Sequence, residues 1–190
     1  MTGAGFLDCK KALADAGGDF DKAAEHLRKS GAAKAVKKGT RAANQGTVAA
    51  YIHFDGGRIG TLVELNCETD FVARNEDFKK LATDIATHVA TGPGPRYVRR
   101  EDVPSEIVEK EKEIYHEQAI QEGKPAAAVE KIVEGKLNNY FKENCLLEHE
   151  FFGDVSGKKR TIKQLVEEAV GKFGENIQIR RFARFDVGQD

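Results

Sequence analysis

The spacing of apolar residues predicts a β-hairpin near the middle of the chain. Over residues 46–54 and 59–67, apolar and more polar residues alternate, which is typical of strands that bury one face. Between them, Asp55-Gly56-Gly57 predicts a tight turn, because glycine adopts positive φ values at little cost. The alternating positions are Val48, Ala50, Ile52 and Phe54, and then Thr61, Val63, Leu65 and Cys67.

The second strand runs into a polar corner where the apolar period changes. Glu68-Thr69-Asp70 is followed at once by Phe71, and a helix with a period of about 3.6 residues is predicted from about Asn75. The residues alone give Phe71 two interpretations. It packs under this helix on the same face as Phe78, or it projects outward as an anchor for another molecule.

Two short helices are predicted before the hairpin. Gly17-Gly18 ends the first, and Asp19 caps the second by accepting hydrogen bonds from its free N–H groups. Ser30-Gly31 is predicted to close the second helix. Two helices of this size bury little alone, which indicates a module that docks on a partner. The predicted buried positions are Phe6, Cys9, Leu13 and Ala16, and then Phe20, Ala23, Ala24 and Leu27.

Helices and one strand are predicted after the central helix. Residues 105–121 and a helix that begins at Gly123-Lys124-Pro125 are expected to form an antiparallel helical hairpin. A capping box over residues 161–164 opens the last helix, and Gly174 ends it. The interrupted alternation of residues 176–187 predicts a final strand with either a bulge or packing on both of its faces.

This order of elements predicts an α+β fold. A three-stranded antiparallel sheet is packed with helices, next to the N-terminal helices and the helical hairpin. A sheet of three strands is small, and its uncovered edge or face favours pairing with a second copy of the chain.

Composition and charge exclude several classes of protein. With a net charge of −1, the chain has no overall basic field for nucleic acid. No apolar run approaches the roughly 18 residues of a membrane span, and the N-terminus lacks the apolar core of a signal peptide, so a cytoplasmic protein is expected. The basic stripe of Lys34, Lys37, Lys38 and Arg41 could bind phosphates. The absence of interleaved aromatic residues favours a solvated linker helix and no specific nucleic-acid partner.

Candidate catalytic groups are poorly supported. The five histidines and three cysteines lack the spacing of a zinc or redox site. Glu64, Glu68 and Asp70 are close in sequence, but no histidine or cysteine is placed as a partner base. With no cofactor or nucleotide motif present, we expect no enzyme, no metal and no cofactor.

The corner carries a family resemblance. The stretch Glu64–Asn75 (ELNCETDFVARN) closely resembles the core signature of bacterial elongation factor Ts. That resemblance implies a nucleotide-exchange factor for the translational GTPase elongation factor Tu, without covalent chemistry. The matching residues that would intrude near the magnesium ion of the GTPase are Thr69, Asp70, Phe71 and Val72. Shorter matches are TGAGFLDCKKAL at 2–13, KSGA at 29–32, CLLE at 145–148, GENI at 174–177 and RRF at 180–182.

The resemblance also implies a domain organisation. Residues 1–31 would form a ubiquitin-associated-like module whose first helix is missing, residues 32–45 a linker helix, and residues 46–190 the α+β core and dimerisation domain. The chain resembles the short, dimer-forming type, which implies a homodimer. Two alternatives stay open: a non-catalytic protein- or RNA-binding module, and an exchange factor weakened by the missing helix.

Overall fold

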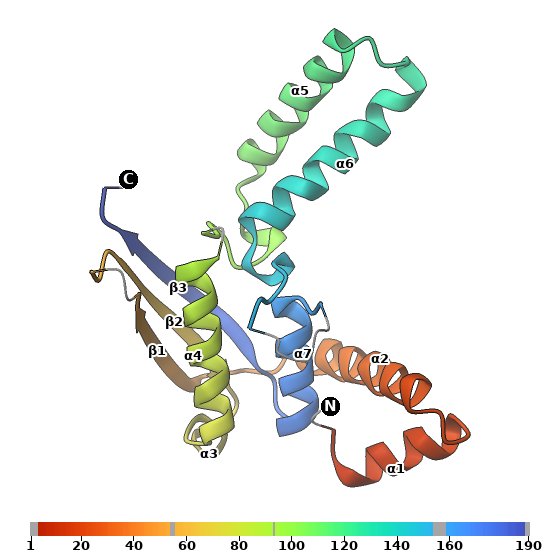
Figure 1. Ribbon diagram of the computed structural model, residues 1–190, viewed down its shortest axis with the longest axis vertical. Coiled ribbons are helices and arrows are strands. Elements are labelled where there is room, and N and C mark those ends of the chain that lie inside the picture. Colours follow the sequence, from red (N-terminus) through yellow and green to blue (C-terminus); the bar gives the residue numbers. More distant parts are fainter. Residues whose placement is uncertain (1–3, 54–55, 93, 154–158, 189–190) are drawn as a thin grey trace.

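The computed structural model describes residues 4–53, 56–92, 94–153 and 159–188 (Figure 1). Their seven α-helices and one three-stranded antiparallel sheet confirm the predicted α+β class and its N-terminal helical segment. The helices are α1 Phe6–Asp15, α2 Phe20–Lys38, α3 Asp70–Ala73, α4 Glu76–Thr91, α5 Ser105–Gln121, α6 Ala126–Asn144 and α7 Ile162–Phe173. The strands are β1 Gln45–Ile52, β2 Ile59–Cys67 and β3 Gln178–Asp186, and the 3-10 turns are η1 Arg100–Asp102 and η2 Leu146–Glu148.

The sheet has β2 at its centre, between β1 and β3, and α4 covers one face (Figure 1). The predicted inward positions of β2 are confirmed, because Val63, Leu65 and Cys67 are completely buried. The bulge is confirmed in β3. Glu64 pairs with Arg181 and Leu65 pairs with Ile179, so Arg180 is the extra residue.

The opposite face of the sheet carries apolar side chains that no described element covers. Val48 and Ile52, which define the alternation of β1, are 64% and 62% exposed, while Ala49 and Tyr51 between them face the core. The alternation therefore predicted the strand correctly, but it marks the uncovered face of β1. We call this surface the open face; its large exposed apolar residues are Val48, Ile52, Leu62 and Phe185.

The main core lies between the inner face of the sheet, α4 and α7. Phe78 of α4 is completely buried and meets Phe173 of α7 edge to face, with ring centroids 6.0 Å apart. Helix α7 begins at the predicted capping box. The Thr161 hydroxyl accepts from the Gln164 N–H at 3.2 Å, and the Gln164 side chain accepts from the Thr161 N–H at 3.0 Å. The helix ends at Gly174, whose φ of 72° lets the chain turn into β3.

The N-terminal helices differ from the prediction. Helix α2 does not close at Ser30-Gly31 but continues to Lys38, so the expected linker helix is its second half. Phe6 and Phe20 are 81% and 71% exposed, whereas Ala12 and Ala23 are the buried residues of α1 and α2. Small side chains fill the contact because two helices provide too little volume to enclose a phenylalanine. The division into domains at residues 31 and 45 stays a prediction.

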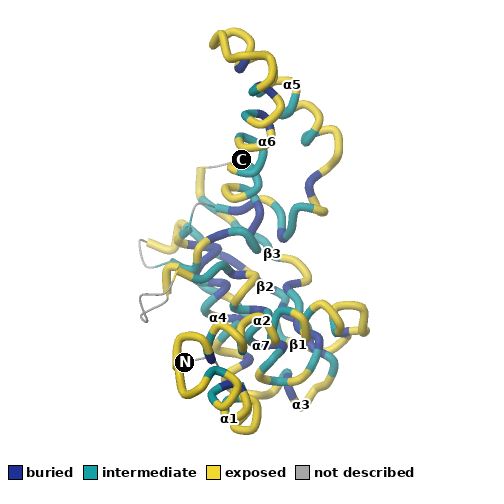
Figure 2. The backbone as a smooth tube through the Cα atoms, turned by 90° about the vertical axis from the view of Figure 1, so that its right-hand side faces the viewer, coloured by how far each residue is buried: buried dark blue, intermediate teal, exposed yellow. Residues whose placement is uncertain are grey.

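Helices α5 and α6 pack on each other as the predicted hairpin and project from the body (Figures 1 and 2). Most of the hairpin surface is exposed or half-buried (Figure 2). At its base, the Arg100 guanidinium donates two N–H groups to the Glu148 carboxylate, each at 2.9 Å. A third N–H group donates to the Asn138 side-chain oxygen at 2.9 Å. Among the described residues, no helix combines the length and the apolar character that a bilayer crossing requires.

A buried histidine pair joins α4 to the base of the hairpin. His88 and His149 are 1% and 3% exposed, and His88 Nε2 lies 3.4 Å from His149 Nδ1. His149 Nε2 lies 3.1 Å from the carbonyl oxygen of Glu143, to which it can donate. Burial, and secondarily His149, lowers the pKa of His88 to about 4; burial also lowers the pKa of His149.

We predict that the protein loses stability as the pH falls from about 6.5 to about 4. The folded-state pKa of His88 is below its unfolded value, so the unfolded chain binds more protons in this window. The loss attributable to His88 is at most about 3 kcal/mol. Thermal unfolding midpoints measured against pH would show a smaller slope in His88→Gln. A His88→Gln variant with the same slope as wild type would contradict the prediction. His116 is exposed, so His116→Gln is the control that should show the wild-type slope.

Candidate partner-binding site at the acidic corner

The corner between β2 and α4 is built from two consecutive capped turns. Thr69 caps the single turn α3, its hydroxyl accepting from the Val72 N–H at 3.4 Å. Asn75 caps α4, its side chain accepting from the Asp77 N–H at 2.9 Å. Between the caps, α3 forms a four-residue projection rather than the start of a longer helix.

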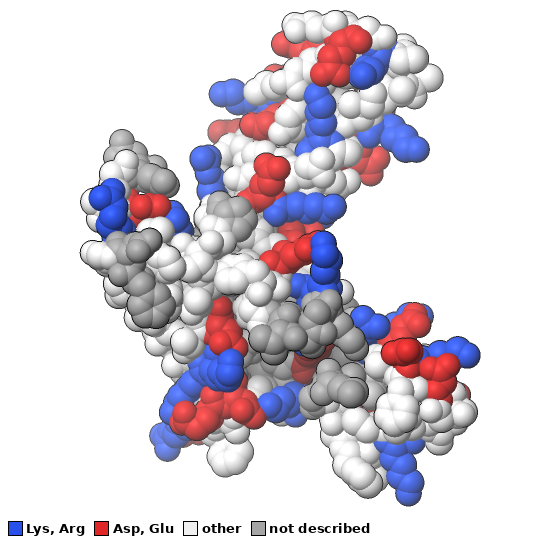
Figure 3. All heavy atoms as spheres, in the orientation of Figure 1, with Lys and Arg blue, Asp and Glu red and all other residues white. Residues whose placement is uncertain are grey.

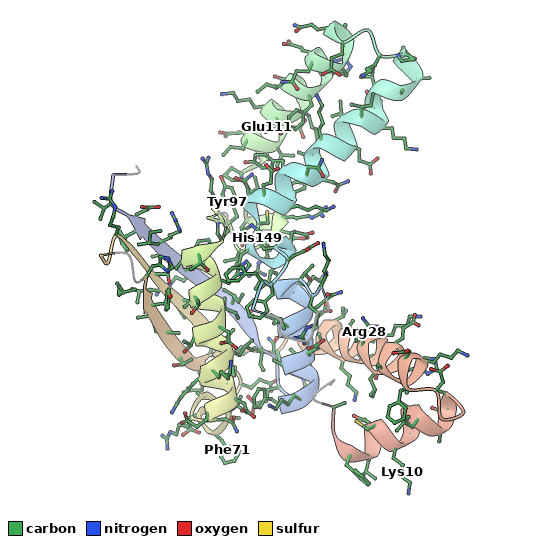
Figure 4. All side chains as sticks on the ribbon, viewed as in Figure 1. Lys10, Arg28, Phe71, Tyr97, Glu111 and His149 are labelled. Carbon is green, nitrogen blue, oxygen red and sulfur yellow. The ribbon has the colours of Figure 1, made fainter. Side chains whose placement is uncertain are left out.

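The four residues implied by the family resemblance point in different directions. Phe71 is 82% exposed and projects from the end of the body (Figure 4). The interpretation in which it packs under α4 is therefore wrong. Val72 turns inward and is buried in the main core. Asp70 is mostly exposed and pairs with Arg74 at 3.1 Å. The corner therefore presents one aromatic ring and one carboxylate. Val72 attaches it to the core, and Thr69 caps its helical turn.

The backbone of the corner is held by Glu175, from the loop between α7 and β3. One carboxylate oxygen of Glu175 accepts from the Glu68 and Thr69 N–H groups at 3.0 and 3.1 Å. Its other oxygen accepts from the Thr69 hydroxyl at 2.6 Å. Our sequence analysis missed this residue. It lies in the GENI match, but nothing in that match indicated which part of the chain its side chain would contact.

The contact is reciprocal, because the corner also holds the loop. The Glu68 carboxylate accepts from the Asn176 N–H at 2.6 Å and lies 3.6 Å from the Arg41 guanidinium. The buried Asn176 side chain in turn donates to the Arg41 carbonyl oxygen at 2.7 Å. The corner, the α7–β3 loop and the segment after α2 are thus joined by one set of polar contacts.

The three carboxylates near the corner have separate partners. Glu64 accepts from Arg181 across the sheet at 2.7 Å, and this hydrogen bond lowers the Glu64 pKa. Glu68 binds the loop, and Asp70 pairs with Arg74. Burial, with Glu175 nearby, raises the pKa of the Cys67 thiol to about 11, so this thiol is neutral at pH 7.

The basic stripe considered for phosphate binding is engaged within the chain. Lys34 pairs with Asp8 at 2.9 Å, Lys38 donates to the Gly174 carbonyl oxygen, and Arg41 pairs with Glu68. These contacts engage three of the four basic side chains and hold α2 and the segment after it against their neighbours. They give no support to the RNA-binding alternative.

Two exposed regions lie at the same end of the molecule. Helices α1 and α3 are both at the end opposite the hairpin in the two perpendicular views (Figures 1 and 2). In Figure 3, acidic and basic side chains are interspersed over this end, without a large area of one sign. Helix α1 and the corner are therefore both exposed at the end away from the hairpin.

The comparisons with known proteins agree with one another. A family model described as Elongation factor TS matches residues 21–189. A protein of Thermosipho melanesiensis named Elongation factor Ts is 54% identical over 188 residues, which cover 99% of this chain and 93% of that protein. A protein of Carboxydothermus hydrogenoformans with the same name is 56% identical, over 99% of this chain and 84% of its own length.

The opposite orientations of two adjacent residues predict different effects on stability. Phe71→Ala should change the free energy of unfolding by less than about 0.5 kcal/mol, because the ring is in solvent. Val72→Ala should lower it by about 2 kcal/mol, because it leaves a cavity in the core. Urea titrations of both variants measure the difference. Equal destabilisation of the two would show that Phe71 packs on the folded body.

Proposed function

The chain belongs to the elongation factor Ts family, and we propose that this translation elongation factor releases GDP from the GTPase elongation factor Tu. The observation that carries the proposal is the orientation of Phe71, an 82% exposed aromatic ring on a turn whose N-terminus is capped by Thr69. Release of a bound nucleotide makes and breaks no covalent bond, so the proposed activity is that of an exchange factor rather than an enzyme.

The proposed mechanism is displacement of the groups that hold magnesium. A bound nucleoside diphosphate is held by backbone N–H groups and by Mg²⁺. Inserting the Phe71 ring next to that site shifts the elements that bind the ion, and nucleotide affinity falls. Asp70 brings a negative charge toward the phosphates and competes for the same donors. Coupling is reciprocal, so nucleotide binding weakens the hold of this protein on the GTPase and permits turnover.

We propose that the N-terminal helices supply a second contact with the GTPase. Phe6, Leu7 and Phe20 are large exposed apolar residues on α1 and α2, and their side chains are free to pack against another protein. In this proposal residues 1–31 dock on the GTPase and residues 46–190 present the corner to it. Residues 32–45 link these two parts. A role in translation places the protein in the cytoplasm.

We propose further that the chain forms a homodimer through the open face. This face exposes Val48, Ile52, Leu62 and Phe185 on adjacent strands, and its burial against a second copy would remove that apolar surface from water. It lies on the side of the sheet away from α4 (Figure 1).

Release of a fluorescent GDP analogue from elongation factor Tu, with unlabelled GDP in excess, tests the exchange proposal. Wild type should accelerate release to a saturating rate. Phe71→Ala should lower that rate by about tenfold or more, the size of effect expected for a central aromatic anchor. Ile120→Ala removes an exposed apolar side chain from the hairpin and should keep the wild-type rate.

Two outcomes would contradict the exchange proposal. One is a folded wild-type protein that does not accelerate release at any concentration. The other is a Phe71→Ala variant whose loss of exchange is matched by an equal loss of stability, which would assign the ring to packing.

The dimer proposal predicts that Leu62→Lys converts the protein to a monomer. A lysine at this position places an ammonium group in the middle of the apolar interface, where it has no partner. Sedimentation equilibrium at several concentrations measures the mass. Ile114→Lys, on the hairpin, is the control that should remain dimeric. A wild-type protein that stays monomeric throughout the concentration range would overturn the proposal.

A further inference from the structure

The turn that carries Phe71 is too short to be stable by itself. Helix α3 has four residues, and a single helical turn fixes several dihedral angles for very few hydrogen bonds. Its flanking N–H groups also need acceptors. Burial of Val72 and the Thr69 cap supply part of the stabilisation that the turn requires. The remaining acceptor comes from a residue 106 positions away, Glu175.

Glu175 determines the direction of the hydrogen bonds through the cap. The Thr69 hydroxyl donates its proton to Glu175 at 2.6 Å, which leaves its lone pairs to accept from the Val72 N–H. The second oxygen of Glu175 accepts from the Glu68 and Thr69 N–H groups, fixing the two peptides just before α3. Both oxygens therefore constrain the backbone from which Phe71 projects.

We propose that Glu175 is a positioning residue for nucleotide exchange, a role that rests on the proposed function. It does not touch the partner in this proposal. It holds α3 in the presented conformation before binding, so the entropy of ordering the corner is not lost when Phe71 inserts. Without it, the ring is still present but its turn is mobile.

The loop that carries Glu175 also fixes the corner relative to α2. Lys38, the last residue of α2, donates to the Gly174 carbonyl oxygen, and Asn176 donates to the Arg41 carbonyl oxygen. Residues 174–176 are thus bonded on one side to the corner and on the other to the end of α2. The two surfaces proposed to meet the GTPase take their relative placement from this loop.

The test is the saturating rate of GDP release for three substitutions of Glu175. Glu175→Ala should lower the rate about tenfold, with less than about a threefold change in the half-saturating concentration, because α1 and α2 still dock. Glu175→Asp keeps the charge but is one methylene too short to reach both sets of donors, so its rate should also fall. Glu175→Gln keeps the length: its oxygen can accept from the two N–H groups, and its NH2 group can donate to the Thr69 hydroxyl oxygen, which still accepts from the Val72 N–H. Its rate should recover to within about threefold of wild type. Glu109→Ala, an exposed glutamate of α5 paired with Lys112, is the matched control.

A second measurement reports on the corner without the GTPase. Arg74, directly after α3, is highly exposed and is a trypsin cleavage site. Cleavage after Arg74, relative to cleavage after Lys131 in α6, should rise in Glu175→Ala and Glu175→Asp and stay near wild type in Glu175→Gln. The thermal unfolding midpoint of each variant shows whether a lower rate of GDP release comes from a less stable fold rather than from a mobile corner.

The outcomes separate this inference from the proposed function. If wild type accelerates GDP release and the alanine and aspartate variants match it, Glu175 has no positioning role. If wild type gives no acceleration, the proposed function fails, and the role of Glu175 in exchange fails with it. Unchanged cleavage after Arg74 in Glu175→Ala would overturn the anchoring itself. If the alanine variant does not fold, the contrast between aspartate and glutamine decides the result.

Discussion

The burial of one face of the central strand is the constraint on which the other elements depend. Val63, Leu65 and Cys67 are completely buried under α4 and between the neighbouring strands, in the same core as the apolar face of α7. Each such side chain contributes roughly 1.5–3 kcal/mol when it leaves water, so the register of β2 is strongly specified. Because β2 ends at Cys67 in this core, the chain must leave the sheet there, and the corner begins at the edge of the packed body.

Apolar packing and polar contacts have different roles at the corner. Val72 fixes α3 to the core, and the contacts among Glu68, Thr69 and Glu175 fix its orientation. The consequence is an exposed phenylalanine on an ordered backbone. Such a ring gains no burial within its own chain, so the free energy of its burial is available for binding another molecule.

The remaining surfaces follow from the small size of the sheet and of the N-terminal helices. Three strands offer two faces, and in the described residues α4 covers one of them, which leaves Val48, Ile52, Leu62 and Phe185 exposed. Helices α1 and α2 meet through alanines, so their phenylalanines remain in solvent. Each exposed apolar group thus reflects a lack of enclosing volume, and each is a candidate contact with another chain.

The element types, the buried face of β2 and the capping box of α7 could be predicted from the sequence, because these depend on local period and on cap chemistry. For β3 the sequence left a bulge and packing on both faces as alternatives. It also carried the family signature around Phe71. Tertiary contacts were needed to show which face of β1 is open, that Phe71 points outward while Val72 points inward, and that Glu175 holds the corner. Those features depend on contacts between residues far apart in the chain, about which neither periodicity nor spacing carries information.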